Sequence, residues 1–378
     1  MATLMYTYLD EVKRNYLDTN LRDIIKGQFN FYSMSSVTFE SEYYKETFED
    51  KWKCFRETFH VPEEKCLHFA ECKKLINSNY RKLIEFKFEY EKGEEDYASL
   101  IQKYDLPNNE FVGTRPLNTE DELKKIIASK VKDSDVAAYN YFNTAGVFSE
   151  NDLFRFFLVL RELLLDSNFF IVHTDIIDRL QKYLPKDSNP KRSLTKETTL
   201  YAPNLRKKNP EIVFSAHLNS LISTLILTEK DGYYYLDENK PDEVYTKLRF
   251  DGDGKEFDAR SDLKRAFNNI QVVGTRDFNS KTTNKILDEI RFIKKDEVGH
   301  KYLPSHAGME VVDFLCSLIA CSTRLEYLKG IGVIDDKSCE EKFNREAYIN
   351  IQFEDGRSVS FSDIIDNNLT ISRIIAMD

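Results

Sequence analysis

Apolar positions along the chain switch between two spacings, and this switching predicts the fold class. Residues 4–9 (LMYTYL) and 29–39 are rich in aromatic and β-branched residues, which favours two strands. From Tyr44 to Phe59, large apolar residues recur every three or four positions, as on the buried face of a helix. Strand and helix signals continue to alternate further along the chain, so we expect an α/β protein with a mixed sheet flanked by helices.

Helix caps and further periodic segments extend this prediction to the rest of the chain. Strands are predicted at 83–90, 169–173, 233–236 and 290–293, and helices after 119, at 149–165, at 209–228, after 261, at 280–288 and at 305–324. Two alternating segments, 347–353 and 359–361, flank Asp355-Gly356 and predict a β-hairpin. We expect a main domain at 1–325 with insertions at about 91–165 and 182–208, and a small C-terminal appendage at 326–378.

The composition indicates a folded protein without a membrane partner. Of the 378 residues, 41% are hydrophobic and 13% are aromatic, which excludes a disordered chain. The most apolar run, 156–165, is short and is interrupted by Arg161 and Glu162. The N-terminus lacks a secretory signal, and six cysteines without a CxxC pair indicate reduced thiols rather than a zinc site. We therefore expect a cytoplasmic protein.

The charge distribution limits how the protein could bind nucleic acid. The net charge of −10 argues against non-specific coating of nucleic acid, which needs a generally basic surface. The segment 182–208 nevertheless carries eight basic residues and only two acidic ones, and it reads as a long loop. Candidate phosphate contacts in it are Lys191, Arg192, Arg206, Lys207 and Lys208. The alternative interpretation is an ordinary solvated surface loop.

Carboxylates follow three of the predicted strands directly. These residues are Asp10-Glu11, Asp175 and Asp237-Glu238. In open α/β sheets, ligands bind beyond the carboxyl ends of the strands, so these side chains could converge there. Each of them could equally be an acidic residue in an ordinary turn.

A fourth candidate lies on the strongly apolar helix predicted at 305–324. Its polar residues His306, Glu310, Asp313 and Ser317 recur at steps of four, three and four, and they form one narrow stripe. A helix this apolar is buried on most sides, where a charge is costly unless it is paired or bound to a metal ion. A narrow solvated face is the alternative.

Carboxylates that meet in one place favour a divalent cation. They repel one another by roughly 1 to 4 kcal/mol per pair, and a hard cation such as Mg²⁺ or Mn²⁺ relieves this repulsion. Two such ions can activate water and stabilise the leaving oxygen in phosphodiester hydrolysis. The predicted chemistry is therefore that of a metal-dependent nuclease acting on DNA or RNA.

Four short blocks, in this order, resemble one known family. They are MYTYLDE at the start, LHFAEC at 67–72, YYYLDE at 233–238 and GMEVVDFL at 308–315. The sequence resembles the family catalogued as domain of unknown function 3800, which implies a ribonuclease H-like mixed sheet with helical and loop insertions. Two positions depart from the family pattern: Val12-Lys13 replaces Ser-Gly, and Glu310-Val311-Val312 replaces Gln-Leu-Ala.

The resemblance implies roles for particular residues. Asp10, Asp237 and Asp313 match the family's principal acidic positions and are the expected metal ligands, while Glu11, Glu71 and His68 match further polar positions. We expect Glu11 and Glu71 to assist catalysis, with His68, Glu238, His306, Glu310 and Asp175 as auxiliary residues.

The remaining histidines and one Asp-Gly repeat fit structural roles, and two other functions are compatible with the sequence. His173 is expected to be a satisfied buried histidine, and His217 to face solvent. Asp251-Gly-Asp253-Gly is rejected as a calcium loop because Lys255 and Glu256 do not fit that motif. A non-catalytic nucleic-acid-binding module or a protein-interaction scaffold could keep the same fold, and a homo-oligomer or an accessory partner would be compatible with either.

Overall fold

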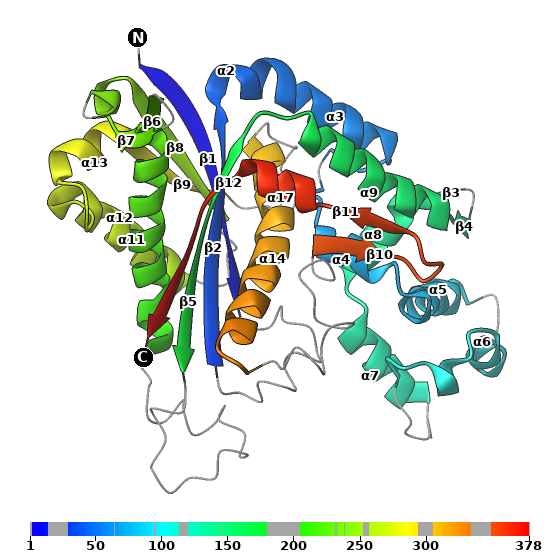
Figure 1. The fold of residues 1–378 in the computed structure, drawn as a ribbon. Coiled ribbons are helices and arrows are strands. Elements are labelled where there is room, and N and C mark those ends of the chain that lie inside the picture. Colours follow the sequence, from blue (N-terminus) through cyan, green and yellow to red (C-terminus); the bar gives the residue numbers. More distant parts are fainter. Residues whose placement is uncertain are drawn as a thin grey trace, which may run out of the picture.

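A six-stranded mixed sheet forms the centre of the protein (Figure 1). The computed structural model describes residues 2–13, 29–63, 65–93, 96–112, 120–144, 146–179, 205–230, 233–237, 239–251, 257–293, 305–333 and 349–377. The strands are β1 (Thr3–Lys13), β2 (Phe29–Glu40), β5 (Phe170–Arg179), β8 (Val244–Asp251), β9 (Leu287–Ile293) and β12 (Leu369–Met377), in the order β12-β5-β2-β1-β8-β9. Strand β2 is antiparallel to both of its neighbours, β1 and β5. Strands β8 and β9 run parallel to β1, and β12 runs parallel to β5.

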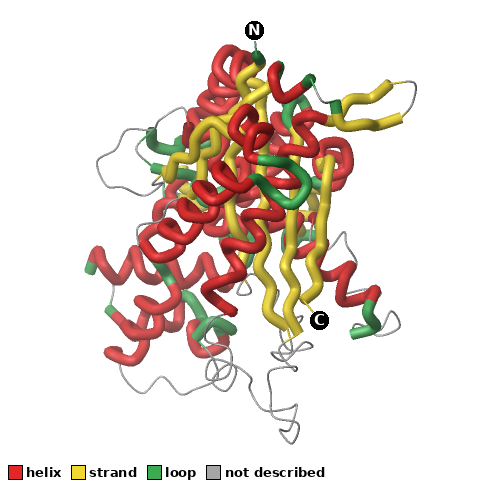
Figure 2. Tube along the Cα trace, turned by 90° about the vertical axis from the view of Figure 1, so that its left-hand side faces the viewer, coloured by secondary structure: helices red, strands yellow, loops and turns green. Residues whose placement is uncertain are grey.

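Helices cover both faces of this sheet, as Figures 1 and 2 show. Helix α14 (Ser305–Gly330) packs on β1 and β2 from one side, and α11 (Leu205–Ile226) packs on β2 and β5 from the other. The alternation of side chains along the strands explains the two layers. Tyr8 and Val37 enter the core on the α14 side, whereas Leu9 and Met34 enter the core on the α11 side. The predicted α/β class with a helix-covered mixed sheet is confirmed.

The remaining helices extend both layers. On the α14 side, one continuous core joins the sheet to α2 (Ser41–Tyr43), α3 (Glu49–Thr58), α4 (Phe69–Lys74), α5 (Ser78–Lys92), α6 (Tyr97–Lys103), α7 (Glu120–Lys130), α8 (Asp133–Tyr141), α9 (Glu150–Leu165) and α17 (Ser362–Asn368). On the α11 side lie α12 (Phe257–Val273) and α13 (Ser280–Ile286). A π-helix at Tyr44–Phe48 and 3-10 turns at Leu106–Asn108 and Lys240–Asp242 complete the helices of the described ranges.

Within the described ranges, three two-stranded sheets lie outside the central sheet. They are β3 (Asn143–Thr144) with β4 (Val147–Phe148), β6 (Leu227–Lys230) with β7 (Tyr233–Leu236), and β10 (Asn350–Gln352) with β11 (Ser358–Ser360). The β10–β11 pair is the hairpin expected from the alternating segments around Asp355-Gly356. Strand β7 was also expected, but it pairs only with β6 and does not join the central sheet.

Two predictions of local structure differ from the observed elements, and several described elements, β8 among them, were not predicted. Residues 83–90 belong to helix α5, because Asn77 caps its start and Gly93, at φ 68°, ends it in the left-handed conformation. Helix α11 begins at Leu205, before the expected cap, so residues 206–208 are helical rather than part of a loop.

The C-terminal segment is not the separate appendage expected at 326–378. Strand β12 is an edge strand of the central sheet, and α14 continues to Gly330 across the predicted boundary. Ile351 and Val359 of the β10–β11 hairpin are buried in the same core as Tyr8. The hairpin alone could not bury these apolar side chains, which explains why it packs on the main body.

Within the described ranges, none of the helices is both long enough and apolar enough to cross a bilayer.

Candidate functional site

A row of polar side chains crosses three strands beneath α14. Asp10 on β1 pairs in register with Ser35 on β2, which in turn pairs with His173 on β5. Ser33 and Asp175 form the next row on the same face. All except Asp10 are fully buried, and Asp10 is only 7% exposed. The alternation of strand side chains therefore places five polar residues on the face that α14 covers.

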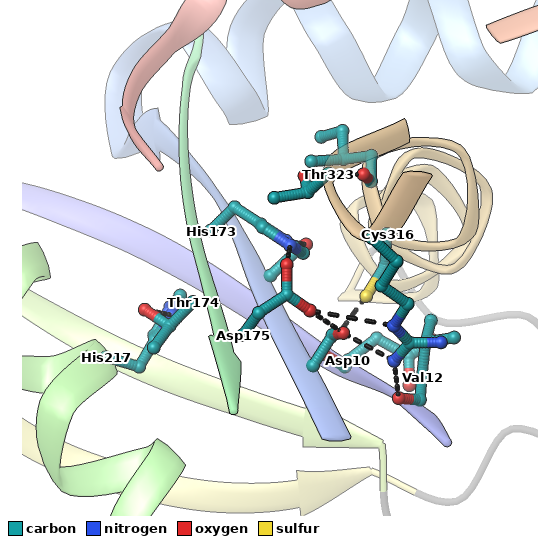
Figure 3. A network of polar contacts seen from close by, with 12 residues as sticks. Asp10, Val12, His173, Thr174, Asp175, His217, Cys316 and Thr323 are labelled. Carbon is teal, nitrogen blue, oxygen red and sulfur yellow. Dashed lines mark hydrogen bonds and ion pairs between the residues drawn. The ribbon is translucent and has the colours of Figure 1, made fainter. Parts of the chain in front are cut away.

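These side chains satisfy one another through short contacts (Figure 3). His173 lies between two partners, with Nδ1 2.7 Å from Ser35 Oγ and Nε2 2.8 Å from Asp175 Oδ2. Ser33 Oγ donates to Asp175 Oδ1, and Arg324 Nε on α14 lies 3.7 Å from the same oxygen. Burial opposes ionisation of Asp175, but His173 and Arg324 outweigh it and hold the pKa of this carboxyl below its ordinary value. His173 is thus the satisfied buried histidine that was expected. Both oxygens of the Asp175 carboxylate are occupied by contacts within the protein.

Asp10 lies where β1 passes under α14. Its Oδ1 accepts a hydrogen bond from Glu11 N at 2.7 Å, and its carbonyl oxygen accepts one from Cys316 Sγ at 3.4 Å. Burial, reinforced by the Asp10 carboxylate, raises the pKa of the Cys316 thiol well above its ordinary value. Cys316 is therefore a neutral donor rather than a reactive thiolate.

Asp313 lies on α14, three residues before Cys316 and hence about one helical turn away. Its Oδ2 is 4.0 Å from His68 Nδ1, and the two side chains are 28% and 25% exposed. Since Cys316 contacts the Asp10 carbonyl, α14 brings the turn that carries Asp313 next to the segment of β1 that carries Asp10. The chain thus brings elements that carry residues 303 positions apart against each other.

Asp237 does not join this region. It follows β7, donates its backbone N–H to Ile226 O, and accepts a hydrogen bond on Oδ1 from Asn239 N. This turn leads to Glu243, whose carbonyl binds Thr3 N at the start of β1. From Thr3 to Asp10, β1 rises by about 23 Å, at roughly 3.3 Å per residue. The grouping of Asp237 with Asp10 is therefore corrected, because YYYL belongs to an outer hairpin.

The aspartate that ends the neighbouring strand of the central sheet is Asp251. Strand β8 runs parallel to β1, and Phe250 pairs in register with Leu9. Asp251 and Asp10 are the next residues of these two strands. The sequence carries a weaker form of the same signal, because in KLRFD charged residues alternate with the apolar Leu248 and Phe250 before the carboxylate. It was missed because Asp251 was tested only as part of a calcium loop.

Glu310 is fully buried and fixes α14 to the helical layer. Its carboxylate accepts hydrogen bonds from Trp52 Nε1 at 2.5 Å, from Leu67 N at 2.7 Å and from Arg56 Nη1. The proposed auxiliary role of Glu310 is thus corrected: both of its oxygens serve the interior of the protein. The cost of burying this charge is offset by the ion pair and by two further donors.

Two other predicted acids lie on α4 and on β1. Glu71 Oε1 accepts a hydrogen bond from Ser134 Oγ on α8 at 3.4 Å. Glu11 follows Asp10 on β1 and so lies on the opposite face of the sheet, on the side of Leu9. Glu11 therefore does not share the face of the sheet on which Asp10 lies.

The other predicted residues fall outside the described part of the chain. Glu238, Lys191 and Arg192 lie there entirely, as do the side chains of His306, Arg206, Lys207 and Lys208. The same holds for the side chain of Asp251, whose backbone is described. Among the described side chains, there is no group of three or more His, Cys, Asp or Glu residues that could hold a metal ion.

His217 does not face solvent, as was expected, but is fully buried on α11. Its Nε2 is 2.8 Å from Ser36 Oγ and its Nδ1 is 3.2 Å from Thr174 Oγ1, on the face of the sheet opposite His173. Helix periodicity alone could not reveal that the polar side of α11 packs on hydroxyl groups of β2 and β5. Burial, with a smaller effect of His173, lowers the pKa of His217 to about 3.

This low pKa makes the stability of the protein depend on pH. Below about pH 6.5 the unfolded chain takes up a proton at His217 that the folded chain refuses, so acid removes stability down to about pH 3. We expect His217→Gln to be destabilised relative to the wild type at pH 7. At pH 5 the difference in free energy of unfolding between wild type and variant should be smaller by up to about 2 kcal/mol. The reason is that the wild type loses about 1.4 kcal/mol of stability for each pH unit below 6.5. Urea unfolding at both pH values measures this, and an unchanged difference would contradict it.

Comparison with known protein families, with curated proteins and with solved structures gives no match.

Proposed function

We propose that the protein is a Mg²⁺- or Mn²⁺-dependent nuclease with a ribonuclease H-like core, in which Asp10, Asp251 and Asp313 hold the metal ions. The sheet supports this proposal. Three antiparallel strands (β5, β2 and β1) are followed by two strands parallel to β1, and α14 follows the last of them. This is the arrangement expected of the fold that the sequence blocks resemble.

The register of β1 and β8 is the observation that carries the proposal. Phe250 pairs with Leu9, so Asp251 and Asp10 take neighbouring positions on adjacent parallel strands, whose backbones are about 4.8 Å apart. Two carboxylates about 4 Å apart repel by roughly 1 kcal/mol in water and by about 4 kcal/mol at an effective dielectric constant of 20. Such a pair favours a cation.

The third carboxylate comes from α14. Asp313 lies one turn before the cysteine that binds Asp10, and its side chain is open to solvent on one side. Carboxylate oxygens are the ligands that Mg²⁺ and Mn²⁺ prefer, and an open side leaves room for water and for a substrate phosphate. The residues present therefore fit such ions.

The chemistry follows from this donor set. When bound, divalent ions in a carboxylate site activate water and stabilise the leaving oxygen of a phosphodiester. Asp10 is rigidly placed by β1 and α14, which suits a residue that must hold geometry through the reaction. Lys191, Arg192, Arg206, Lys207 and Lys208 are the proposed phosphate contacts that would position the DNA or RNA strand.

Calorimetric titration with Mn²⁺, followed by incubation with labelled DNA and RNA oligonucleotides, tests this function. We expect the wild type to bind Mn²⁺ and to cleave at least one of the two nucleic acids, and Asp10→Asn to do neither. A wild type that binds no Mn²⁺ contradicts the proposal. Mn²⁺ binding without cleavage would instead favour a non-catalytic nucleic-acid-binding protein or scaffold.

A further inference from the structure

Arg324 is a fully buried cation that ties α14 to three strands of the sheet. Its Nη2 donates to Val12 O on β1 at 2.7 Å and to Ser33 Oγ on β2, and its Nε faces Asp175 Oδ1 on β5 at 3.7 Å. The guanidinium also lies over the Phe31 ring, 5.3 Å from its centroid. We propose that Arg324 is a positioning residue for Asp10, an inference that rests on the function proposed above.

The stability of the fold does not by itself explain why an ion pair is buried at this place. Removing a guanidinium and a carboxylate from water costs free energy, and well-packed apolar residues of similar volume are often as stabilising. Arginine differs from an apolar residue because its planar guanidinium group donates several hydrogen bonds in fixed directions. Here the oxygens that face the guanidinium belong to β1, β2 and β5, so Arg324 fixes the positions of these three strands relative to one another.

Two contacts from α14 flank Asp10 along β1. Cys316 Sγ binds the carbonyl of Asp10 itself, and Arg324 binds the carbonyl of Val12, two residues further along the same strand. Asp313 lies on the same helix, one turn before Cys316. The distance between the Asp10 and Asp313 carboxylates is thus controlled by how firmly α14 holds this stretch of β1.

A second path leads to Asp10 through side chains and through the pairing of β2 with β1. Ser35 pairs in register with Asp10 and contacts His173. His173 contacts Asp175 (Figure 3), and Asp175 faces Arg324. The path closes a ring from Asp10 through β2, β5 and α14 back to Val12. Because every member apart from Asp10 is fully buried, none can move without displacing its neighbours.

Substituting Arg324→Lys tests this inference. Lysine keeps the positive charge but lacks the planar guanidinium group, so we expect Asp10 to shift. The Mn²⁺ affinity should then fall at least about tenfold, as is typical when residues that orient metal ligands are changed. Excess Mn²⁺ should restore nuclease activity to the wild-type level. Because Mn²⁺ would also stabilise a partly unfolded variant, circular dichroism without Mn²⁺ must show that Arg324→Lys is folded before the metal is added.

Arg81→Lys provides a matched control. Arg81 is also buried, and it also bridges main-chain carbonyls, those of Leu75 and Ile76, to a carboxylate, that of Glu150. It lies on α5, away from α14. We expect Arg81→Lys to lower thermal stability without changing the Mn²⁺ affinity.

The outcomes separate this inference from the proposed function. Arg324→Lys with wild-type Mn²⁺ affinity, or Arg81→Lys with an equal loss, overturns the positioning role while leaving the nuclease intact. A wild type that binds no Mn²⁺ overturns both. If Arg324→Lys does not fold, the Mn²⁺ affinity of Ser33→Ala tests the inference instead, because this substitution removes the hydroxyl group that contacts both Arg324 and Asp175. We then expect a severalfold weaker Mn²⁺ affinity, and an unchanged affinity overturns the inference.

Discussion

Asp251→Asn is expected to abolish Mn²⁺ binding and nuclease activity, whereas Asp237→Asn is expected to leave both unchanged. Asp251 ends the strand that pairs with β1, but Asp237 lies in an outer hairpin where its carboxylate caps a local turn. A carboxylate ligand contributes several kcal/mol to holding a divalent ion, and about 1.4 kcal/mol corresponds to a factor of ten. The Mn²⁺ affinity of Asp251→Asn should therefore fall at least about 100-fold.

Calorimetry with Mn²⁺ and cleavage of labelled oligonucleotides measure this contrast. Asp237→Asn is the matched control, because it makes the same chemical change directly after another strand, β7. Loss of Mn²⁺ binding in Asp237→Asn, with normal binding in Asp251→Asn, would reverse the assignment and favour the pattern implied by the family resemblance. Normal binding in both variants would remove β8 from the site.

Arg56→Met is expected to cause the largest loss of stability. Arg56 holds the buried carboxylate of Glu310 and also donates to Pro62 O at 2.7 Å and to Lys65 O at 2.5 Å. Breaking a buried ion pair leaves an uncompensated charge, which costs about 3 to 5 kcal/mol. We expect a loss of this size in the free energy of unfolding, measured by urea denaturation.

Two further variants test the physical reason for this loss. Adding Glu310→Gln to Arg56→Met removes the unpaired charge and keeps one acceptor oxygen, which serves either Trp52 Nε1 or Leu67 N but not both. Because the charge is the larger cost, we expect the double variant to recover part of the stability. Lys53→Met breaks the exposed pair with Glu57, 3.9 Å long, and should cost less than about 1 kcal/mol. If the double variant is less stable than Arg56→Met, the loss does not come from the unpaired charge.

Some of the candidate site could be predicted from single segments. The strand that carries Asp10 and the apolar helix that carries Asp313 were both expected, and the structure has them as β1 and α14. Both elements have strong periodicity, and packing on a large core reinforces that preference. The expectation that a charge in α14 must be paired also holds for Glu310, although its partner is Arg56 rather than a metal ion.

Other parts of the site depend on which strands become neighbours. Asp237 and Asp251 both lie at the ends of strand segments, and nothing in either segment shows which one pairs with β1. Similarly, His217 lies among Ser and Thr residues on a helix with a polar side, which is typical of solvent exposure. Its burial follows from hydroxyl groups on β2 and β5 that supply partners within hydrogen-bonding distance.

The amino-acid sequence by itself determined the α/β class, most of the helices and the segments that end in carboxylates, because these depend on periodicity and on capping within a few residues. Only the tertiary structure decided the strand order, the inclusion of β12 in the sheet, and the selection of Asp251 over Asp237 beside Asp10. It also decided that Glu310 and Asp175 serve the interior of the protein. These outcomes depend on contacts between residues far apart in the chain, and such contacts are set by how the whole core packs rather than by any local pattern.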